Sequence, residues 1–411
     1  MSFFQYTDGA GGNGMKEIRG KYLLVLIAMC GVIAASIGIT TNTAGVYITP
    51  VSEAFGVGKG AVSMTLTIAN LVYAMAGLLA AGLFNRNSYR TVSLVSMIVL
   101  AASTAAMGLC QNMAMLYVCS AVRGLSAGLL GSVTATTILN SWFVKNAGLV
   151  TSIAFGFSGI TGALLSPVIS AIISRFNWQT GYFFSAVVIV LMELPAVLLP
   201  IAYEPEVLGM KALGYEESSE KEKNVEESNG KAVSLAPFLL VLVFASFAAF
   251  ATALPTHLPG IAESYGLGVG ALCLSVCMAA NTGGKLLLGV LMDKFGEKRS
   301  ILAYGCGIMA GLLLLQFVRV DFSMLAGAAL AGLSYSLGTV GTVMVCRAVF
   351  GSENYGTVYP KVALGGTLSN AAGASIIGFI YDFTGGYSLA LVLIFFMTAV
   401  SMIVVKAVLK H

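Results

Sequence analysis

The sequence predicts an all-α membrane protein with twelve transmembrane helices in two pseudo-symmetric six-helix bundles. Three observations support this fold class. Apolar residues make up 57% of the 411 residues and charged residues only 10%, too few charges to cover a soluble domain of this size. Twelve apolar runs are long enough to cross a hydrocarbon core about 30 Å thick. One hydrophilic segment divides these runs into two sets of six.

The twelve runs are the predicted membrane-spanning helices. Their apolar residues are continuous rather than alternating, which indicates helices and not the strands of a membrane barrel. The first run is longer than the apolar core of a signal peptide, and no small-residue cleavage motif closes it, so we expect a retained helix. The runs lie at residues 22–48, 61–83, 91–109, 114–139, 147–173, 181–202, 235–256, 269–292, 300–318, 322–346, 356–380 and 387–405.

The positive charges orient these helices in the membrane. With a cytoplasmic N-terminus, sixteen of the 22 Lys and Arg residues fall in cytoplasmic segments, as positive charges tend to do in membrane proteins. Only Lys59, Arg175 and Arg319 fall outside. We therefore expect a multi-pass protein of the cell (plasma) membrane, embedded in the lipid bilayer with both termini cytoplasmic. The net charge of +4 follows from this topology and indicates no nucleic-acid partner.

The hydrophilic segment, residues 203–233, has mixed charges and no apolar periodicity. These properties are typical of a cytoplasmic linker. It separates an N-terminal six-helix bundle, residues 1–202, from a C-terminal six-helix bundle, residues 234–411.

The two halves also share three local matches at an offset of 205 to 208 residues, each at an equivalent loop. Three matches in register indicate two parallel repeats related by an axis normal to the membrane. A substrate path is then expected between the halves. The matched segments are Asn85–Arg90 with Asp293–Lys298, Phe143 and Gly148 with Phe350 and Gly356, and Gly181–Tyr182 with Gly386–Tyr387.

The first of these loops resembles the signature of the major facilitator superfamily, G-x-x-x-D-[RK]-x-G-x-[RK]. The second copy comprises Gly289, Asp293, Lys294, Gly296 and Lys298, followed by Arg299. The first copy is degraded: Ala81 replaces the first glycine, Asn85 the aspartate and Ser88 the second glycine. Arg86 and Arg90 remain. The resemblance covers essentially the whole chain and implies the major facilitator fold.

The signature residues are expected to form a conformational latch. Gly289 would permit close helix approach, Gly296 a tight turn of positive φ, and Asp293 a cap on a neighbouring helix. Such contacts, made in one state and broken in the other, are what a rocking transporter needs. The alternative is a plain positively charged cytoplasmic turn.

Within the superfamily, residues 141–182 resemble the oxalate/formate antiporter and monocarboxylate transporter families. In those families a basic residue, usually arginine, stands four positions before the signature glycine on the eighth helix; here it is Lys285. The resemblance implies a secondary active transporter, a symporter or antiporter, that moves a small organic anion by alternating access. A lysine lacks the planar guanidinium group that binds a carboxylate through two hydrogen bonds, so the resemblance does not identify the substrate.

Charges inside the predicted helices favour an anionic substrate. Arg123, Lys285 and Lys361 lie within helices, against a single clear acid, Glu193. Retained intramembrane charges are costly and need partners or a function. The excess of two positive charges would attract an anion, which supplies the missing counter-charge when it binds.

Each candidate has an alternative. Lys285 shares a helix face with Asn281, at a depth of about 10 Å, from which the lysine could instead snorkel to the cytoplasm. Arg123 lies near the midplane and could pair with Glu193 or helix carbonyls. Lys361 follows Pro360 and could also snorkel.

Two polar clusters supply the remaining candidates. We expect Asn42 and Tyr335 to contact substrate, although hydroxyl groups in such clusters also bond to their own helix. His257, between two prolines, is expected in an interfacial loop. The cysteines form no C-x-x-C pair, and we expect no metal and no cofactor.

Other functions remain open. A drug/proton antiporter of the same fold is one alternative, although no Gly-Pro dipeptide occurs in the chain. A non-transporting membrane sensor is another. An enzyme is not expected, because the sequence contains no catalytic motif at usable spacing. We expect a monomer that binds a small anionic substrate and a coupling proton or counter-substrate.

Overall fold

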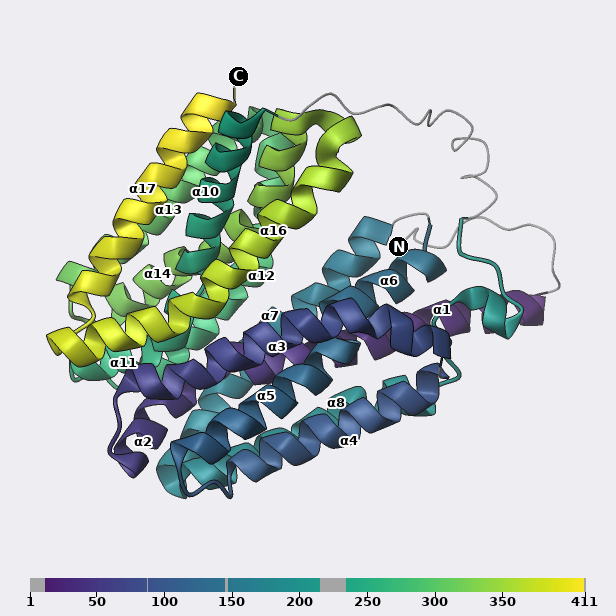
Figure 1. Ribbon diagram of the computed structural model, residues 1–411, viewed down its shortest axis with the longest axis horizontal. Coiled ribbons are helices and arrows are strands. Elements are labelled where there is room, and N and C mark those ends of the chain that lie inside the picture. Colours follow the sequence, from purple (N-terminus) through teal and green to yellow (C-terminus); the bar gives the residue numbers. More distant parts are fainter. Residues whose placement is uncertain (1–11, 87, 145–146, 215–233, 410–411) are drawn as a thin grey trace.

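The computed structural model shows two helical bundles that meet at one end and diverge toward the other (Figure 1). It describes residues 12–86, 88–144, 147–214 and 234–409, without the side chains of 12–19, 81, 85, 86, 352, 353 and 356. Within this part of the chain, twelve helical segments are long and apolar enough to cross a membrane. The predicted fold class is confirmed.

The N-terminal bundle contains the first six spans. Three of its helices are capped by side chains: Ser88, Asn112 and Asn177 accept hydrogen bonds from backbone amides in the first turns that follow them. Its elements are α1 (Gly12–Ile33), the π-helix η1 (Ala34–Asn42), α2 (Gly45–Phe55), α3 (Lys59–Arg86), α4 (Tyr89–Met107), α5 (Met113–Leu130), α6 (Ser132–Trp142), α7 (Ala147–Arg175) and α8 (Trp178–Leu198).

The C-terminal bundle contains the other six. Helix α16 includes the end of the tenth span and all of the eleventh, which join at Gly351, where φ is 68°. The elements are α10 (Leu235–Ala251), η4 (Leu254–His257), α11 (Leu258–Ser264), α12 (Gly270–Phe295), α13 (Glu297–Phe317), α14 (Asp321–Gly332), α15 (Ser334–Ser336), the π-helix η5 (Leu337–Gly341), α16 (Thr342–Thr384) and α17 (Ser388–Val408).

The first, fourth, seventh and tenth spans are interrupted, and these are equivalent positions in the two halves. The fourth span breaks at Gly131, which leaves the α-helical region. The amide that the break frees, that of Ser132, donates to the Tyr73 hydroxyl at 2.6 Å. Buried backbone groups inside a membrane need such a partner, which explains how the break is tolerated.

The seventh span corrects one expectation. We predicted an interfacial loop around His257, yet this side chain is 1% exposed and its Nε2 lies 2.8 Å from the Ala374 carbonyl oxygen. The span runs on to Ser264 because Pro255 and Pro259 occupy the first turns of two short helices, where proline is tolerated.

The beginning of the hydrophilic segment packs against the N-terminal bundle. A short 3₁₀ helix, η2 (Pro205–Leu208), is followed by a backbone bridge between Leu213 and Phe143. The Tyr22 hydroxyl donates to the Lys211 carbonyl at 2.6 Å. Residues 203–214 are therefore fixed to the first half.

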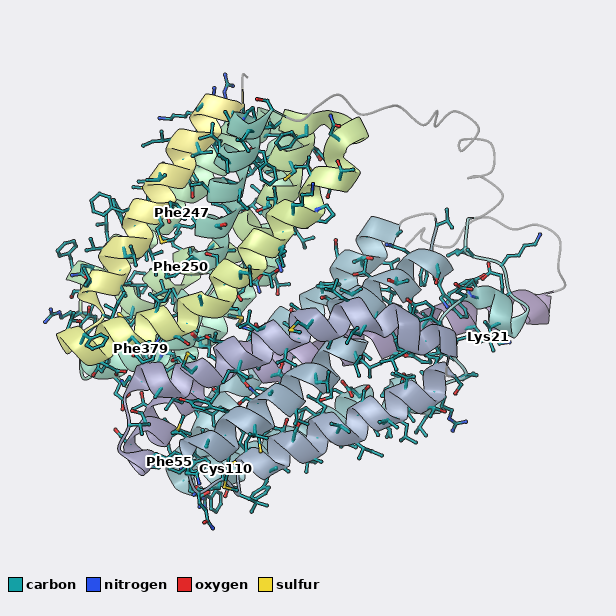
Figure 2. The ribbon with its side chains drawn as sticks, viewed as in Figure 1. Lys21, Phe55, Cys110, Phe247, Phe250 and Phe379 are labelled. Carbon is teal, nitrogen blue, oxygen red and sulfur yellow. The ribbon has the colours of Figure 1, made fainter. Side chains whose placement is uncertain are left out.

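The bundles pack through two pairs of helices, α3 with α16 and α7 with α12. We call the end at which α2 and α11 lie the closed end, and the opposite end, where α17 finishes and α10 begins, the open end (Figure 1). Phe379 of α16 lies at the closed end (Figure 2). A methyl group on Gly60 of α3 would clash with the Phe379 ring, so the helices are in close contact there.

Candidate functional site

The closed end is held by a carboxylate of one bundle that caps a helix of the other. Asp382, near the end of α16, accepts hydrogen bonds from the backbone amides of Lys59 and Gly60 at 2.7 and 2.8 Å. These amides begin α3 and have no partner within the helix. The negative carboxylate also lies at the positive end of the α3 dipole. Asp382 therefore joins the two halves.

The Lys59 side chain adds to this contact. It is 8% exposed, and its Nζ lies 4.4 Å from the centroid of the Tyr381 ring and 5.7 Å from that of Tyr387. Burial raises the pKa of the Tyr387 phenol, which therefore stays neutral. Glu53 and Glu263 lie near enough to interact with the ammonium. The closed end is thus a charged cluster drawn from both bundles.

Further contacts join the bundles next to this cluster, on the side toward the open end. The Thr67 hydroxyl lies 2.6 Å from both the Ala371 carbonyl and the Ser375 hydroxyl. On the other side, Thr282 of α12 packs against Gly159 of α7. Both helix pairs are therefore in contact through this level.

The contact ends about halfway along the helices. Leu78 follows Thr67 by eleven residues and Leu364 precedes Ala371 by seven, spacings that keep each leucine on the interface face of its helix. Leu78 is 81% exposed and Leu364 57%. Side chains that would face the other bundle are therefore uncovered toward the open end.

Lys285 lies where the contact ends. It follows Met278 by two helical turns, and Met278 packs against Gly162 of α7, so Lys285 faces the N-terminal bundle. Its side chain is half-buried. Within the described residues no carboxylate forms an ion pair with it. A basic group thus stands without a counter-charge at the interface.

Two predicted neighbours of Lys285 are brought close to it. Asn281, one turn earlier on α12, is 3% exposed, and its Oδ1 has no hydrogen-bond partner among the described residues. Tyr335 belongs to α15, which packs against α12. Ser336, next to Tyr335, would meet a side chain placed at Gly284. Lys285, Asn281 and Tyr335 therefore belong to one region of the C-terminal bundle.

Arg123 is not part of that region. It lines a cavity of about 20 Å³ whose described walls all come from the N-terminal bundle. The predicted alternative, a pair with Glu193, is not formed: in the part of the chain that the structure describes, neither the Arg123 Nε nor either oxygen of Glu193 has a hydrogen-bond partner. Both residues are nonetheless buried, at 5% and 1% exposure.

The other two predicted substrate-binding residues, Asn42 and Lys361, lie elsewhere. Asn42 donates from Nδ2 to the Ser158 carbonyl at 2.9 Å, a contact within the N-terminal bundle. Lys361 is exposed on the half of α16 toward the open end. Neither residue is brought to Lys285 by a contact in the described structure.

The residues of the predicted latch lie at the open end, and most of them are exposed. Gly296 adopts φ 82° between α12 and α13, so the tight turn is confirmed. Asp293, like Lys294, Arg299 and Arg90, is exposed. The close approach expected at Gly289 is not observed: a side chain at this position would meet open space. The two bundles are apart at this end of the molecule (Figure 1). The Arg86 side chain lies outside the described residues.

The sequence analysis assigned no functional role to Asp382 or Lys59. They are 323 residues apart. A signal did exist: both residues lie on the outer side of the predicted topology, where a positive charge such as that of Lys59 is rare. Lys59 is one of the three basic residues that broke the charge pattern.

Comparisons with known proteins agree with this architecture. The sequence matches the profile of the family described as the Major Facilitator Superfamily over residues 28–315 and 239–410. The fold is similar to solved structures of a bacterial homolog to the human lysosomal transporter Spinster. The inward-facing occupied form has 14% identity and a TM-score of 0.65, covering 97% of this chain and 98% of that one. The inward-facing unoccupied form has 17% identity and a TM-score of 0.66, covering 95% and 98%. A search of curated protein sequences finds no significant match.

Proposed function

Because the chain belongs to the major facilitator superfamily, we propose that it is a secondary active transporter that carries a small organic anion, a carboxylate, by alternating access. One observation supports this proposal above the others. Lys285 places a basic group on the interface face of α12, where the contact between the bundles ends. Asn281, one turn earlier on the same helix, adds a side-chain amide whose Nδ2 group can donate to a carboxylate.

The electrostatics of Lys285 favour an anion over a cation or a neutral molecule. An ammonium group in the membrane interior costs a few kcal/mol unless it is paired. No carboxylate of the described chain pairs with it. A substrate carboxylate would supply the counter-charge, and a charged hydrogen bond contributes about 1.5–3 kcal/mol. Binding would thus offset a cost that the empty protein bears.

The arrangement of the bundles supports alternating access. The helix ends at the open end carry the basic residues Arg90, Lys294, Arg299 and Lys406, which makes it the cytoplasmic end under the charge rule. In this state the substrate region is open toward the cytoplasm. The opposite state requires that the closed end separate, which breaks the bonds of Asp382 to α3, while the latch at the open end engages.

Uptake into proteoliposomes tests the proposal. Purified protein is assayed with a panel of labelled carboxylates, amino acids and organic cations, beside Lys285→Ala and Lys285→Arg. We expect uptake of a carboxylate, loss of most of it in Lys285→Ala, and partial retention in Lys285→Arg. Lys406→Ala, which changes an exposed lysine at the end of α17, is the matched control and should transport normally.

Two results would overturn the proposal. Transport of cations alone would remove the anionic substrate. Normal carboxylate uptake by Lys285→Ala would remove the anchor. Lys361→Ala, assayed in parallel, shows whether the exposed lysine on α16 contributes as well.

A further inference from the structure

The interior of the N-terminal bundle contains a cavity that the proposed transport site does not use. It is lined by side chains from the first, second, third, fourth and sixth spans, and its volume is about 20 Å³. One water molecule needs roughly 10–15 Å³ measured in this way. The cavity is thus large enough for a water molecule or an ion of similar size.

Among the described residues, a single charged group faces this cavity. Arg123 is 5% exposed, and its Nε is buried without a hydrogen-bond partner. A guanidinium does not give up its proton in proteins. The charge therefore cannot be removed by deprotonation, and a buried charge without a partner is strongly unfavourable.

The walls supply hydrogen-bond donors and no acid. None of the described residues that line the cavity is Asp or Glu. Tyr182 is buried in the wall, and its hydroxyl has no hydrogen-bond partner in the described structure. The hydroxyls of Tyr47 and Ser185 lie 2.9 Å apart, so that one donates to the other and the accepting hydroxyl keeps its own proton free to donate.

The threonines of the wall do not compete for this role. Thr40, Thr65 and Thr104 already donate to backbone carbonyls of their own helices at 2.5 to 2.8 Å. The remaining walls are apolar, formed by isoleucine, leucine, valine and alanine side chains. A weakly hydrated anion would lose little by entering such surroundings.

We propose that this cavity binds a halide, chloride under cellular conditions, held by Arg123, Tyr182 and the Tyr47–Ser185 pair. A water molecule would satisfy the donors but would leave the charge unpaired. Chloride accepts hydrogen bonds from the donors and also neutralises the charge of Arg123. The ion would join α2, α5 and α8 and so hold the bundle together as one rigid body. This site is separate from Lys285, and it stands whether or not the protein transports a carboxylate.

Thermal unfolding of the detergent-solubilised protein tests the site. Sodium methanesulfonate is replaced stepwise by sodium chloride, bromide or iodide at constant ionic strength, and tryptophan fluorescence reports the midpoint. Trp178 is a suitable probe because its ring lies 6.0 Å from that of Tyr182. We expect a saturable halide-dependent rise in the midpoint. It should be absent in Arg123→Gln, and its half-maximal concentration should increase at least tenfold in Tyr182→Phe.

Arg175→Gln is the matched control, because Arg175 lies at the end of α7, outside the cavity, and it should keep the full halide response. A wild-type midpoint that does not respond to halide would overturn the proposal, as would an equal response in Arg123→Gln. An equal rise with formate or acetate would assign the cavity to carboxylates and also overturn it. Should Arg123→Gln fail to fold, anomalous scattering from bromide-soaked wild-type crystals decides, since no peak beside Arg123 would refute the site.

Discussion

The replacement Asp382→Asn isolates the contact that joins the two bundles at the closed end. The carboxylate accepts two backbone hydrogen bonds, from Lys59 and Gly60, at 2.7 and 2.8 Å. The amide keeps one acceptor oxygen and the same size, but it loses the charge and turns an acceptor into a donor that faces an N–H group. The change therefore weakens this contact while leaving the folds of both bundles in place.

The magnitude follows from the two bonds. A hydrogen bond to a charged group contributes about 1.5–3 kcal/mol, and a carboxylate at the start of a helix adds about 0.3–1 kcal/mol through the helix dipole. Loss of one charged bond and of the dipole term gives about 2–4 kcal/mol. Because 1.4 kcal/mol is a factor of ten, the ratio of outward-open to inward-open molecules should rise by roughly 30- to 700-fold.

Distances between spin labels measure that ratio. Cysteines placed at Phe176 and Phe317, which are 66% and 73% exposed at the closed end of separate bundles, are labelled after the seven native cysteines are replaced. Double electron–electron resonance spectroscopy should show one short distance in the parent protein. In Asp382→Asn it should show this distance together with a second, longer one. Asp321→Asn, an acid at the start of α14 on the same side, is the control. An unchanged distribution in Asp382→Asn would refute the role of this contact.

Two further substitutions test the packing around the site. Gly60→Ala places a methyl group against the Phe379 ring, so it should shift the same label distances toward the outward-open state; no shift would mean that this close contact does not hold the bundles together. Tyr73→Phe removes the acceptor of the Ser132 amide at the break in the fourth span, which should lower the thermal midpoint by the equivalent of about 1–3 kcal/mol for an unsatisfied buried group. Tyr117→Phe, whose hydroxyl donates to the partly buried Ala61 carbonyl, is the comparison, and an equal effect in both would contradict the reasoning.

Hydropathy and charge were sufficient to predict the spans and the two halves. A membrane segment must satisfy its own backbone within an apolar environment, so its length and composition are visible in any stretch of sequence. The breaks within spans were harder to foresee. The break at Gly131 depends on the Tyr73 hydroxyl of another helix, and the buried position of His257 depends on Ala374. Both partners are distant in the sequence.

The candidate site shows the same limit. Helix periodicity was enough to group Lys285 with Asn281, because both belong to α12. It could not show that Arg123 lines a cavity within its own bundle, since that depends on which helices surround α5. The signature around Gly296 was recognisable as a local motif, whereas the contact of Asp382 with α3 arises only when the halves meet.

The central claim, that Lys285 binds an anionic substrate, is tested most directly by a comparison of two ligands. The affinities of the carboxylate identified by uptake and of its neutral amide are measured for the parent protein and for Lys285→Gln. A lost charged hydrogen bond of about 1.5–3 kcal/mol corresponds to a roughly 10- to 100-fold weaker affinity. We predict this loss for the carboxylate and no change for the amide. Equal changes for both ligands, or an unchanged affinity for the carboxylate, would contradict the claim.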